Sequence, residues 1–133
     1  MGRAARLLVV DDEPALRHVV VLLLTKMGYE AIAAEGGEAA LALLNGGLAP
    51  DVILLDLLMP RMSGIQFVEA ARGQGYDLPT VLVSASPEAA EHAHRLGLAG
   101  HQRKPYDIGA LRDTIEAALS LSAPPYVSPA ASS

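Results

Sequence analysis

Short apolar runs alternate along the chain with segments in which apolar side chains recur at helical spacing. The runs that we expect to form strands are Arg6–Val10, Glu30–Ala33, Val52–Asp56, Thr80–Ser84 and Gly100–Arg103. The first, third and fourth are dominated by branched aliphatic side chains, which is typical of strands that are buried on both faces of a parallel sheet.

A helical segment follows each predicted strand. In the first of these segments Leu16, Val19, Val20, Leu23, Leu24 and Met27 recur at helical spacing, and Pro14 suits its first turn. The others are expected at Glu38–Leu44, from Ser63 or Gly64 to Gly73, at Pro87–Leu96 and at Ile108–Leu121. Strict alternation of strands and helices predicts a parallel sheet with right-handed crossovers and helices on both faces. The expected fold class is therefore α/β, with a doubly wound five-stranded parallel sheet.

The composition fits one compact domain. The chain has 133 residues, of which 51% are hydrophobic and 19% are charged, so it can form an apolar core. Its apolar runs are far shorter than the roughly 20 residues of a membrane span, and residues 1–6 are too polar for a secretory signal. The absence of cysteine excludes disulfides and thiolate chemistry and fits a reducing compartment. We therefore expect a soluble, cytoplasmic protein without a membrane partner.

Charge and the end of the chain add two expectations. The net charge is −5 and the ten Lys and Arg residues are scattered, so we expect no basic face for direct nucleic-acid binding. Residues 122–133 are rich in Pro, Ser and Ala and have no periodicity, which indicates a flexible tail or the start of a linker. The domain itself is expected to span residues 1–121.

Polar side chains stand at the carboxyl ends of four predicted strands. Asp11 and Asp12 follow the first strand, Asp56 closes the third, Ser84 ends the fourth and Lys104 follows the fifth. In open α/β sheets, ligands bind beyond these strand ends, where the strand order reverses. We therefore expect the five side chains to converge at one edge of the sheet.

Three carboxylates in one cleft require a cation, because they otherwise repel one another and raise one another's pKa. Mg²⁺ suits the cluster, since it prefers oxygen ligands and needs only a few carboxylates. The remaining side chains suit phosphoryl transfer, in which a protein chiefly positions groups and neutralises charge. Asp56 would be the nucleophile and form an acyl phosphate, Lys104 would neutralise one phosphoryl oxygen and Ser84 would donate a hydrogen bond to another.

Each of these features alone also has a structural explanation. The run Asp11-Asp12-Glu13 before Pro14 is the pattern of an acidic helix N-terminus, which the helix dipole favours. A single Asp, Ser or Lys after a strand is usually a turn residue. The combination at four strand ends indicates a site.

At this point the sequence resembles the response-regulator receiver family over about Arg6 to Leu121. The matching stretches are Leu8-Val9-Val10-Asp11-Asp12-Glu13-Pro14, residues 51–60 (Asp-Val-Ile-Leu-Leu-Asp-Leu-Leu-Met-Pro), Gly64, Val83-Ser84-Ala85 and Lys104-Pro105-Tyr106. The resemblance implies a flavodoxin-like, chemotaxis-regulator-like fold with strand order 2-1-3-4-5 and five helices. It also implies a signalling module of a two-component phosphorelay rather than an enzyme.

Carried over residue by residue, the resemblance implies a Mg²⁺ site, with Mn²⁺ as a substitute ion. Asp12 would bind the ion directly and Asp11 partly through water. Asp56 would be both ligand and phosphoacceptor, and the backbone carbonyl of Leu58 would complete the protein ligands. Ser84 would be the switch hydroxyl.

Lys104 would be the lysine that pairs with the phosphoryl group. Its bond to Pro105 is typically cis in the family, which is plausible because a proline follows. Tyr106 stands where the family commonly has Phe, and we expect it to pack.

Three features depart from the family pattern. The aromatic switch position is occupied by His101, Gln102 replaces an aliphatic residue of the fifth strand, and the segment from Ser84 to Lys104 is about two residues short. We expect a trimmed fourth helix whose start Pro87 fixes. His101 is either a tolerated planar replacement or a pH-sensitive element. All three fall on the face of the fourth helix, fifth strand and fifth helix, so they concern output more than phosphorylation chemistry.

The resemblance implies a histidine kinase or histidine phosphotransfer protein as phosphodonor, docked near the first helix and His18, and slow self-catalysed dephosphorylation. The output would be a changed affinity for a downstream protein, with a phosphorylation-dependent homodimer as one form. Both a stand-alone regulator and the N-terminal domain of a longer regulator stay open.

Two other classes share parts of this pattern. A haloacid-dehalogenase-like phosphatase also uses a strand-end Asp with Mg²⁺, but it requires a second Asp where this chain has Leu58. A flavodoxin-like cofactor binder would need a glycine- or hydroxyl-rich phosphate cradle after the first strand, where this chain has Asp11-Asp12-Glu13. Both patterns fit less well than the receiver.

Overall fold

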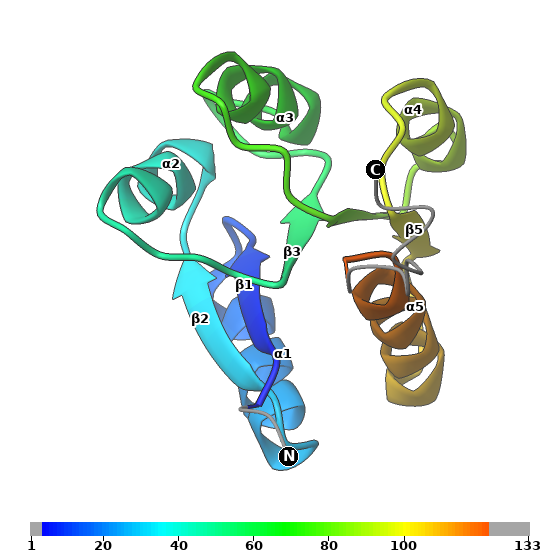
Figure 1. Cartoon of the computed structure of the whole chain (residues 1–133). Coiled ribbons are helices and arrows are strands. Elements are labelled where there is room, and N and C mark those ends of the chain that lie inside the picture. Colours follow the sequence, from blue (N-terminus) through cyan, green and yellow to red (C-terminus); the bar gives the residue numbers. More distant parts are fainter. Residues whose placement is uncertain (1–3, 123–133) are drawn as a thin grey trace, which may run out of the picture.

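The computed structural model describes residues 4–122 as a five-stranded parallel sheet with five helices (Figure 1). The strand order is β2-β1-β3-β4-β5, which confirms the predicted doubly wound topology. The elements, in chain order, are β1 (Arg6–Val10), α1 (Pro14–Lys26), β2 (Glu30–Ala34), α2 (Gly37–Asn45), β3 (Val52–Asp56), α3 (Gly64–Gly73), β4 (Thr80–Ser84), α4 (Ala89–Arg95), β5 (Gly100–Arg103) and α5 (Ile108–Ser122).

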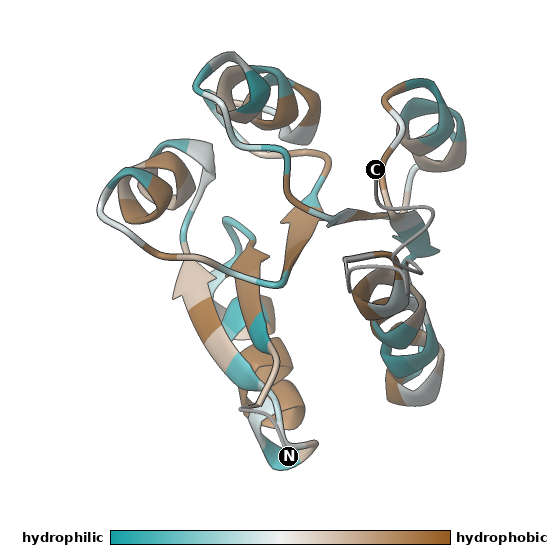
Figure 2. Ribbon diagram, viewed as in Figure 1, coloured by the Kyte–Doolittle hydropathy of each residue, from teal (hydrophilic) through white to brown (hydrophobic). Residues whose placement is uncertain are grey.

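Two apolar layers hold the helices on opposite faces of the sheet (Figures 1 and 2). On one face α1 and α5 pack against the strands through Leu24, Leu111 and Ile115, all fully buried. On the other face α2, α3 and α4 pack through Leu44, Phe67 and Ala93, among others. Successive residues of β1, β3 and β4 alternate between the two layers, so these strands must be apolar on both faces.

The edge strand β5 differs from the central strands. Its residues alternate between partly buried and exposed, and the side chains of His101 and Arg103 face solvent. Gln102 points toward α5, where its Oε1 accepts a hydrogen bond from the Thr114 hydroxyl at 2.7 Å. This partner explains how a polar residue is accommodated where the family pattern has an aliphatic one.

The start of α4 differs from the prediction. The helix begins at Ala89 rather than at Pro87, and it has only seven residues. Pro87 lies in a turn that is held by Ser86, whose hydroxyl accepts from the Glu88 backbone N–H at 3.3 Å. The Ser86 carbonyl accepts from the Ala89 N–H at 3.2 Å, so this turn, and not the proline, determines where the helix begins.

Two further expectations meet the structure only in part. The predicted tail, residues 122–133, lies outside the described residues except for Ser122, which is the last residue of α5. Among residues 4–122, none of the helices combines the length and the apolar character that crossing a membrane would require.

Candidate functional site

The carboxyl edge of the sheet carries the predicted site residues. Hydrogen bonds between neighbouring chain segments continue just past the strands: the Asp11 N–H donates to the Ala34 carbonyl at 3.2 Å, and the Lys104 N–H donates to the Ser84 carbonyl at 2.9 Å. The backbone of the site is therefore held by the same sheet that forms the core.

The structure brings three of the predicted carboxylates together. Asp11, Asp12 and Asp56 each have a carboxylate oxygen within 4.8 Å of the others. Asp11 is buried, Asp56 is partly buried and Asp12 is exposed, so the cluster opens to solvent on one side. Oxygen ligands of Mg²⁺ stand about 2.1 Å from the ion, hence up to about 4.2 Å apart. A small contraction would let one ion join all three, so these residues fit the cation that the sequence predicted.

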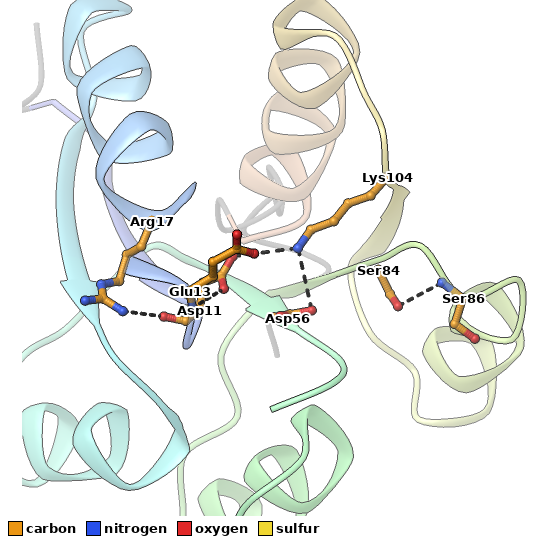
Figure 3. A network of polar contacts seen from close by, with 7 residues as sticks. All are labelled: Asp11, Glu13, Arg17, Asp56, Ser84, Ser86 and Lys104. Atoms are coloured by element: carbon orange, nitrogen blue, oxygen red, sulfur yellow. Dashed lines mark hydrogen bonds and ion pairs between the residues drawn. The ribbon is translucent and has the colours of Figure 1, made fainter. Parts of the chain in front are cut away.

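Lys104 is the cation that faces the cluster (Figure 3). Its Nζ lies 3.7 Å from Asp11 Oδ2 and 3.8 Å from Asp56 Oδ1. Both distances exceed those of a direct hydrogen bond, so the ammonium attracts both carboxylates without being committed to either. The Lys104–Pro105 peptide bond is cis, as the resemblance implied.

The carboxyl group of Asp56 is electrostatically unusual. Burial is the main cause that raises its pKa, from 3.8 to about 6. The charge of Lys104 and a hydrogen bond with the Leu58 backbone lower it, while the charges of Asp11 and Asp12 raise it. Ionising the Asp56 carboxyl group is costly in this environment. A bound cation or a covalently attached group would lower that cost.

Asp11 is held in place by two contacts that the sequence did not reveal. Its Oδ1 accepts a hydrogen bond from the Glu13 N–H at 2.9 Å, and its backbone carbonyl accepts one from Arg17 Nη1 at 2.7 Å. Arg17 lies one helical turn into α1 and returns over the loop (Figure 3). Nothing in its spacing from Asp11 distinguishes it from an ordinary surface arginine.

The hydroxyl of Ser84 is turned toward its own loop. Ser84 is only 2% exposed, and its Oγ accepts a hydrogen bond from the Ser86 N–H at 3.0 Å (Figure 3). Ser86 in turn donates from its hydroxyl to Glu88 at 2.8 Å. Ser84 therefore stands at the neighbouring strand end, as predicted, with its oxygen engaged by the β4–α4 loop rather than by the carboxylates.

The loop after Asp56 approaches that residue closely. A Cβ atom at Gly64 would lie 2.6 Å from the Asp56 carbonyl oxygen, which is too close for any side chain. The Gly64 N–H donates to the Leu57 carbonyl at 2.8 Å, so the start of α3 packs directly on the end of β3. Leu58, by contrast, presents an apolar side chain that is 68% exposed.

Two residues near the site have positions that sequence patterns could not specify. His101 is exposed on β5, where it pairs in register with Leu82, so the structure does not bring its ring into the carboxylate cluster. Tyr106 is half-buried, and burial, followed by the charges of Asp11 and Asp56, raises its pKa. Tyr106 also lines a small void together with Asp11, Asp56 and Lys104, although the sequence indicated only a packing role.

Comparison with known protein families gives a match over most of the chain. The family described as "Response regulator receiver domain" matches residues 7–116. The chain is 34% identical over 117 residues to the Regulator of RpoS of Escherichia coli, covering 86% of this chain and 34% of that protein. It is 33% identical to the phosphate regulon transcriptional regulatory protein PhoB of Escherichia coli, covering 91% of this chain and 54% of PhoB. The chain thus spans between a third and about half of these relatives.

Solved structures of similar size resemble the whole fold. The chemotaxis protein CheY4 of Vibrio cholerae superposes with a TM-score of 0.77 at 33% identity, covering 85% of this chain and 97% of that one. The response regulator protein TrrA of Thermotoga maritima, solved in complex with Mg²⁺ and BeF, has a TM-score of 0.76 at 29% identity, with 86% and 98% of the two chains covered.

Proposed function

The chain belongs to the response-regulator receiver family of two-component signalling, and within that family we propose that Asp56 is its phosphoacceptor. Receivers are signalling modules that bind Mg²⁺ at an acidic cluster and interact with histidine kinases and downstream effectors. For this chain, the proposal assigns a phosphohistidine of a histidine kinase or phosphotransfer protein as the donor.

The observation that carries this proposal is the placement of Lys104. Its Nζ stands 3.7 Å from Asp11 and 3.8 Å from Asp56, two carboxylates of a three-carboxylate cluster, and burial raises the pKa of Asp56. At these distances the ammonium attracts both carboxylates without a direct hydrogen bond to either. A small movement of Lys104 would let it pair with an oxygen of a phosphoryl group on Asp56.

The metal ligands are proposed to be Asp11, Asp12 and Asp56, with the Leu58 carbonyl. Bound Mg²⁺, or Mn²⁺ in its place, would neutralise charge on the phosphoryl oxygens. Burial and the neighbouring aspartates explain why the cluster needs such a charge, because they disfavour the ionised form of Asp56.

The transfer itself is a displacement at phosphorus. A carboxylate oxygen of Asp56 forms the new P–O bond while the P–N bond to the donor histidine breaks, and the imidazole leaves with its electron pair. Asp56 must be ionised to attack, which its pKa of about 6 permits at neutral pH. The Lys104 side chain pairs with a phosphoryl oxygen.

The switch is proposed to begin at Ser84. Its hydroxyl would leave the Ser86 N–H, which it now accepts from at 3.0 Å, and donate to a phosphoryl oxygen. This move would rearrange the β4–α4 loop, and His101 on the neighbouring strand β5 would change its surroundings on the face of α4, β5 and α5. The output is then a changed affinity for a protein partner, which includes a second copy of the chain.

The test is intact-protein mass spectrometry after incubation with acetyl phosphate and Mg²⁺. We expect one phosphoryl adduct on the wild-type chain, lost with chelator and lost in Asp56→Asn. Asp113→Asn, which removes an exposed carboxylate on α5, serves as the matched control and should keep the adduct. An adduct that persists in Asp56→Asn would refute the assignment.

The same experiment separates the receiver from a phosphatase. Leu58 offers no carboxyl group two residues after Asp56 to act as a general acid, so the adduct should accumulate rather than turn over. Continuous release of inorganic phosphate without an adduct would favour the phosphatase instead.

A further inference from the structure

The loop between β3 and α3, residues 57–63, connects the proposed phosphoacceptor to the next helix and is anchored at both ends. It begins directly after Asp56 and ends at Ser63, which caps α3 by accepting a hydrogen bond from the Gln66 N–H at 3.2 Å. Between these anchors lies Leu58, whose backbone forms a hydrogen bond with the Asp56 carboxyl group. The conformation of the middle of the loop therefore determines where Leu58 lies relative to Asp56.

The middle of the loop contains a tight turn with an unfavourable backbone conformation. The Met62 N–H donates to the Pro60 carbonyl at 2.7 Å, a hydrogen bond that encloses only one residue, Arg61. Arg61 has a φ of 67°, and among residues 4–122 it is the only residue other than glycine with a positive φ. A three-residue turn with a positive central φ is rare and strained. Such a turn persists where the surrounding structure holds it in place.

Two contacts with the beginning of α2, which covers the same face of the sheet as α3, hold this turn (Figure 1). The partly buried Met62 side chain lies against the backbone of Gly37, where a Cβ would come within 2.5 Å of Met62 Sδ. Arg61 Nε lies 3.2 Å from Glu38 Oε1 in an exposed ion pair. An exposed ion pair contributes little, so the fit of Met62 against Gly37 is the contact that we expect to hold the turn.

A side chain at Gly37 would disturb the loop and not only the end of the Met62 side chain. Rotation about the Met62 Cβ–Cγ bond would move Sδ away, but Cγ would stay 3.0 Å from the added Cβ, closer than the roughly 3.5 Å of ordinary carbon contacts. Rotation about the Cα–Cβ bond would remove Met62 from the apolar cluster against which it packs. Gly36 differs, because its φ of 176° is extended and a Cβ there would meet nothing within 4 Å.

We propose that Gly37 is a positioning residue: by leaving room for Met62, it holds the β3–α3 loop in the conformation in which Leu58 supplies its carbonyl to the metal ion. The inference rests on the proposed function, in which Leu58 is a metal ligand. Glycine is a poor helix former, so α2 gains nothing from having it as its first residue. The glycine is instead required by the neighbouring loop, although it lies outside the carboxylate cluster.

Affinity for the metal ion alone tests the proposal, because a purely structural role of Gly37 would change stability and leave the Kd of the ion unaltered. The probe is Mn²⁺, titrated into the full chain and followed by the electron paramagnetic resonance signal of the free ion. Binding that is lost in Asp12→Asn is assigned to the cluster. In Gly37→Ala the Kd should rise about tenfold, as when other supports of a metal ligand are disturbed. Gly36→Ala is the matched control and should bind Mn²⁺ like the wild type.

A second pair of variants tests whether Met62 is the partner of Gly37. Met62→Ala opens the space beside Gly37, so adding Gly37→Ala to this variant should change the Kd by less than about twofold. An equal, tenfold loss in both backgrounds, or no loss in the wild-type background, would overturn the proposal. If Gly37→Ala does not fold, the double variant should fold and bind Mn²⁺ as Met62→Ala does. A double variant that also fails to fold would count against the proposal.

The failure of this inference differs from the failure of the proposed function. With saturating Mg²⁺ and acetyl phosphate, Gly37→Ala should still form the adduct on Asp56, because excess ion compensates for the weaker binding. If the wild type is labelled and Gly37→Ala binds Mn²⁺ with unchanged Kd, the phosphoacceptor assignment stands and the role of Gly37 is wrong. If the wild type forms no adduct, the phosphoacceptor assignment fails, and the Mn²⁺ titrations still decide the role of Gly37.

Discussion

Two regions of the sheet, the β1–β3–β4 centre and the β5 edge, differ in how their side chains are packed. The central strands bury nearly every side chain between two helix layers, and their carboxyl ends hold the acidic cluster. The edge strand β5 alternates between solvent and a polar contact with α5, and it carries His101 and Gln102. The proposed chemistry therefore rests on the part of the molecule that tolerates least change.

This difference explains where the chain departs from its family. The departures at His101 and Gln102 fall where side chains are exposed or only partly buried, and the short α4 buries only Ala89 and Ala93. Substitution there costs little stability, so partner surfaces can vary while the phosphoacceptor geometry is retained. Mutations that compare the two regions directly can test this account.

The largest expected effect comes from the register pair Leu82 and His101, which lie side by side on β4 and β5. Leu82 is fully buried, so Leu82→Ala should lower the free energy of unfolding by about 2–5 kcal/mol through lost burial and a cavity. His101→Ala removes an exposed ring and should change it by less than about 0.5 kcal/mol. Urea unfolding of both variants measures the contrast, and comparable losses would contradict it.

A smaller effect is expected at the two ends of α3. Gly64→Ala forces a Cβ to within 2.6 Å of the Asp56 carbonyl, so it should cost about 1–3 kcal/mol and slow labelling of Asp56 by acetyl phosphate. Gly73→Ala is the matched control, since a Cβ there meets nothing within 4 Å. It should be neutral or slightly stabilising, by up to about 1 kcal/mol. Equal labelling rates in both variants would mean that the close approach does not position Asp56.

The smallest effect concerns the charge of Asp56 in the absence of metal. Its pKa is raised from 3.8 to about 6 in the folded chain, chiefly by burial, so the folded state favours the neutral carboxyl group. The neutral Asp56 carboxyl group therefore adds to the free energy of unfolding below about pH 4, and this contribution is lost as the pH rises through about 6. Asp56→Asn should therefore be more stable than wild type by about 1–2 kcal/mol at pH 7.5 in chelator, after allowance for partial solvent screening.

The pH series and added Mg²⁺ check the sign of this effect. The advantage of Asp56→Asn should shrink toward pH 4, where the folded wild-type carboxyl group is neutral and the unfolded one is only partly ionised. Saturating Mg²⁺ should reverse it at pH 7.5, because only the wild type keeps all three carboxylates. Asp113→Asn should show neither trend, and a wild type that is more stable than Asp56→Asn in chelator at pH 7.5 would contradict the burial argument.

Much of the fold follows from periodicity, and the departures from prediction are local. Four strands have the predicted bounds, and β2 ends one residue later, at Ala34. The predicted start of α4 at Pro87 was wrong. A proline is compatible with the first turn of a helix, but the hydrogen bonds of Ser86 form a separate turn there. Hydrogen bonds from one hydroxyl to its own loop leave no periodic signal in the sequence.

In the site, too, the positions of residues at strand ends could be predicted from the sequence, whereas individual hydrogen bonds could not. The convergence of Asp11, Asp12, Asp56 and Lys104 was predictable, since each follows or closes a strand whose burial the apolar runs indicate. The hydrogen bond from Arg17 to the Asp11 carbonyl was not predictable, because a surface arginine in a helix is common. The hydrogen bond from the Ser86 N–H to the Ser84 hydroxyl was not predictable either, since the same residues allow that hydroxyl to face the cluster.

The sequence by itself determined the sheet, the edge at which chemistry occurs and the residue types gathered there, because strand burial and strand-end position are encoded by local apolar patterns. Only the tertiary structure decided the distances of Lys104 from two carboxylates and the raised pKa of Asp56. These properties depend on burial and on charges from segments far apart in the chain. Such interactions are fixed by packing in three dimensions and not by the spacing of residues along one strand or helix.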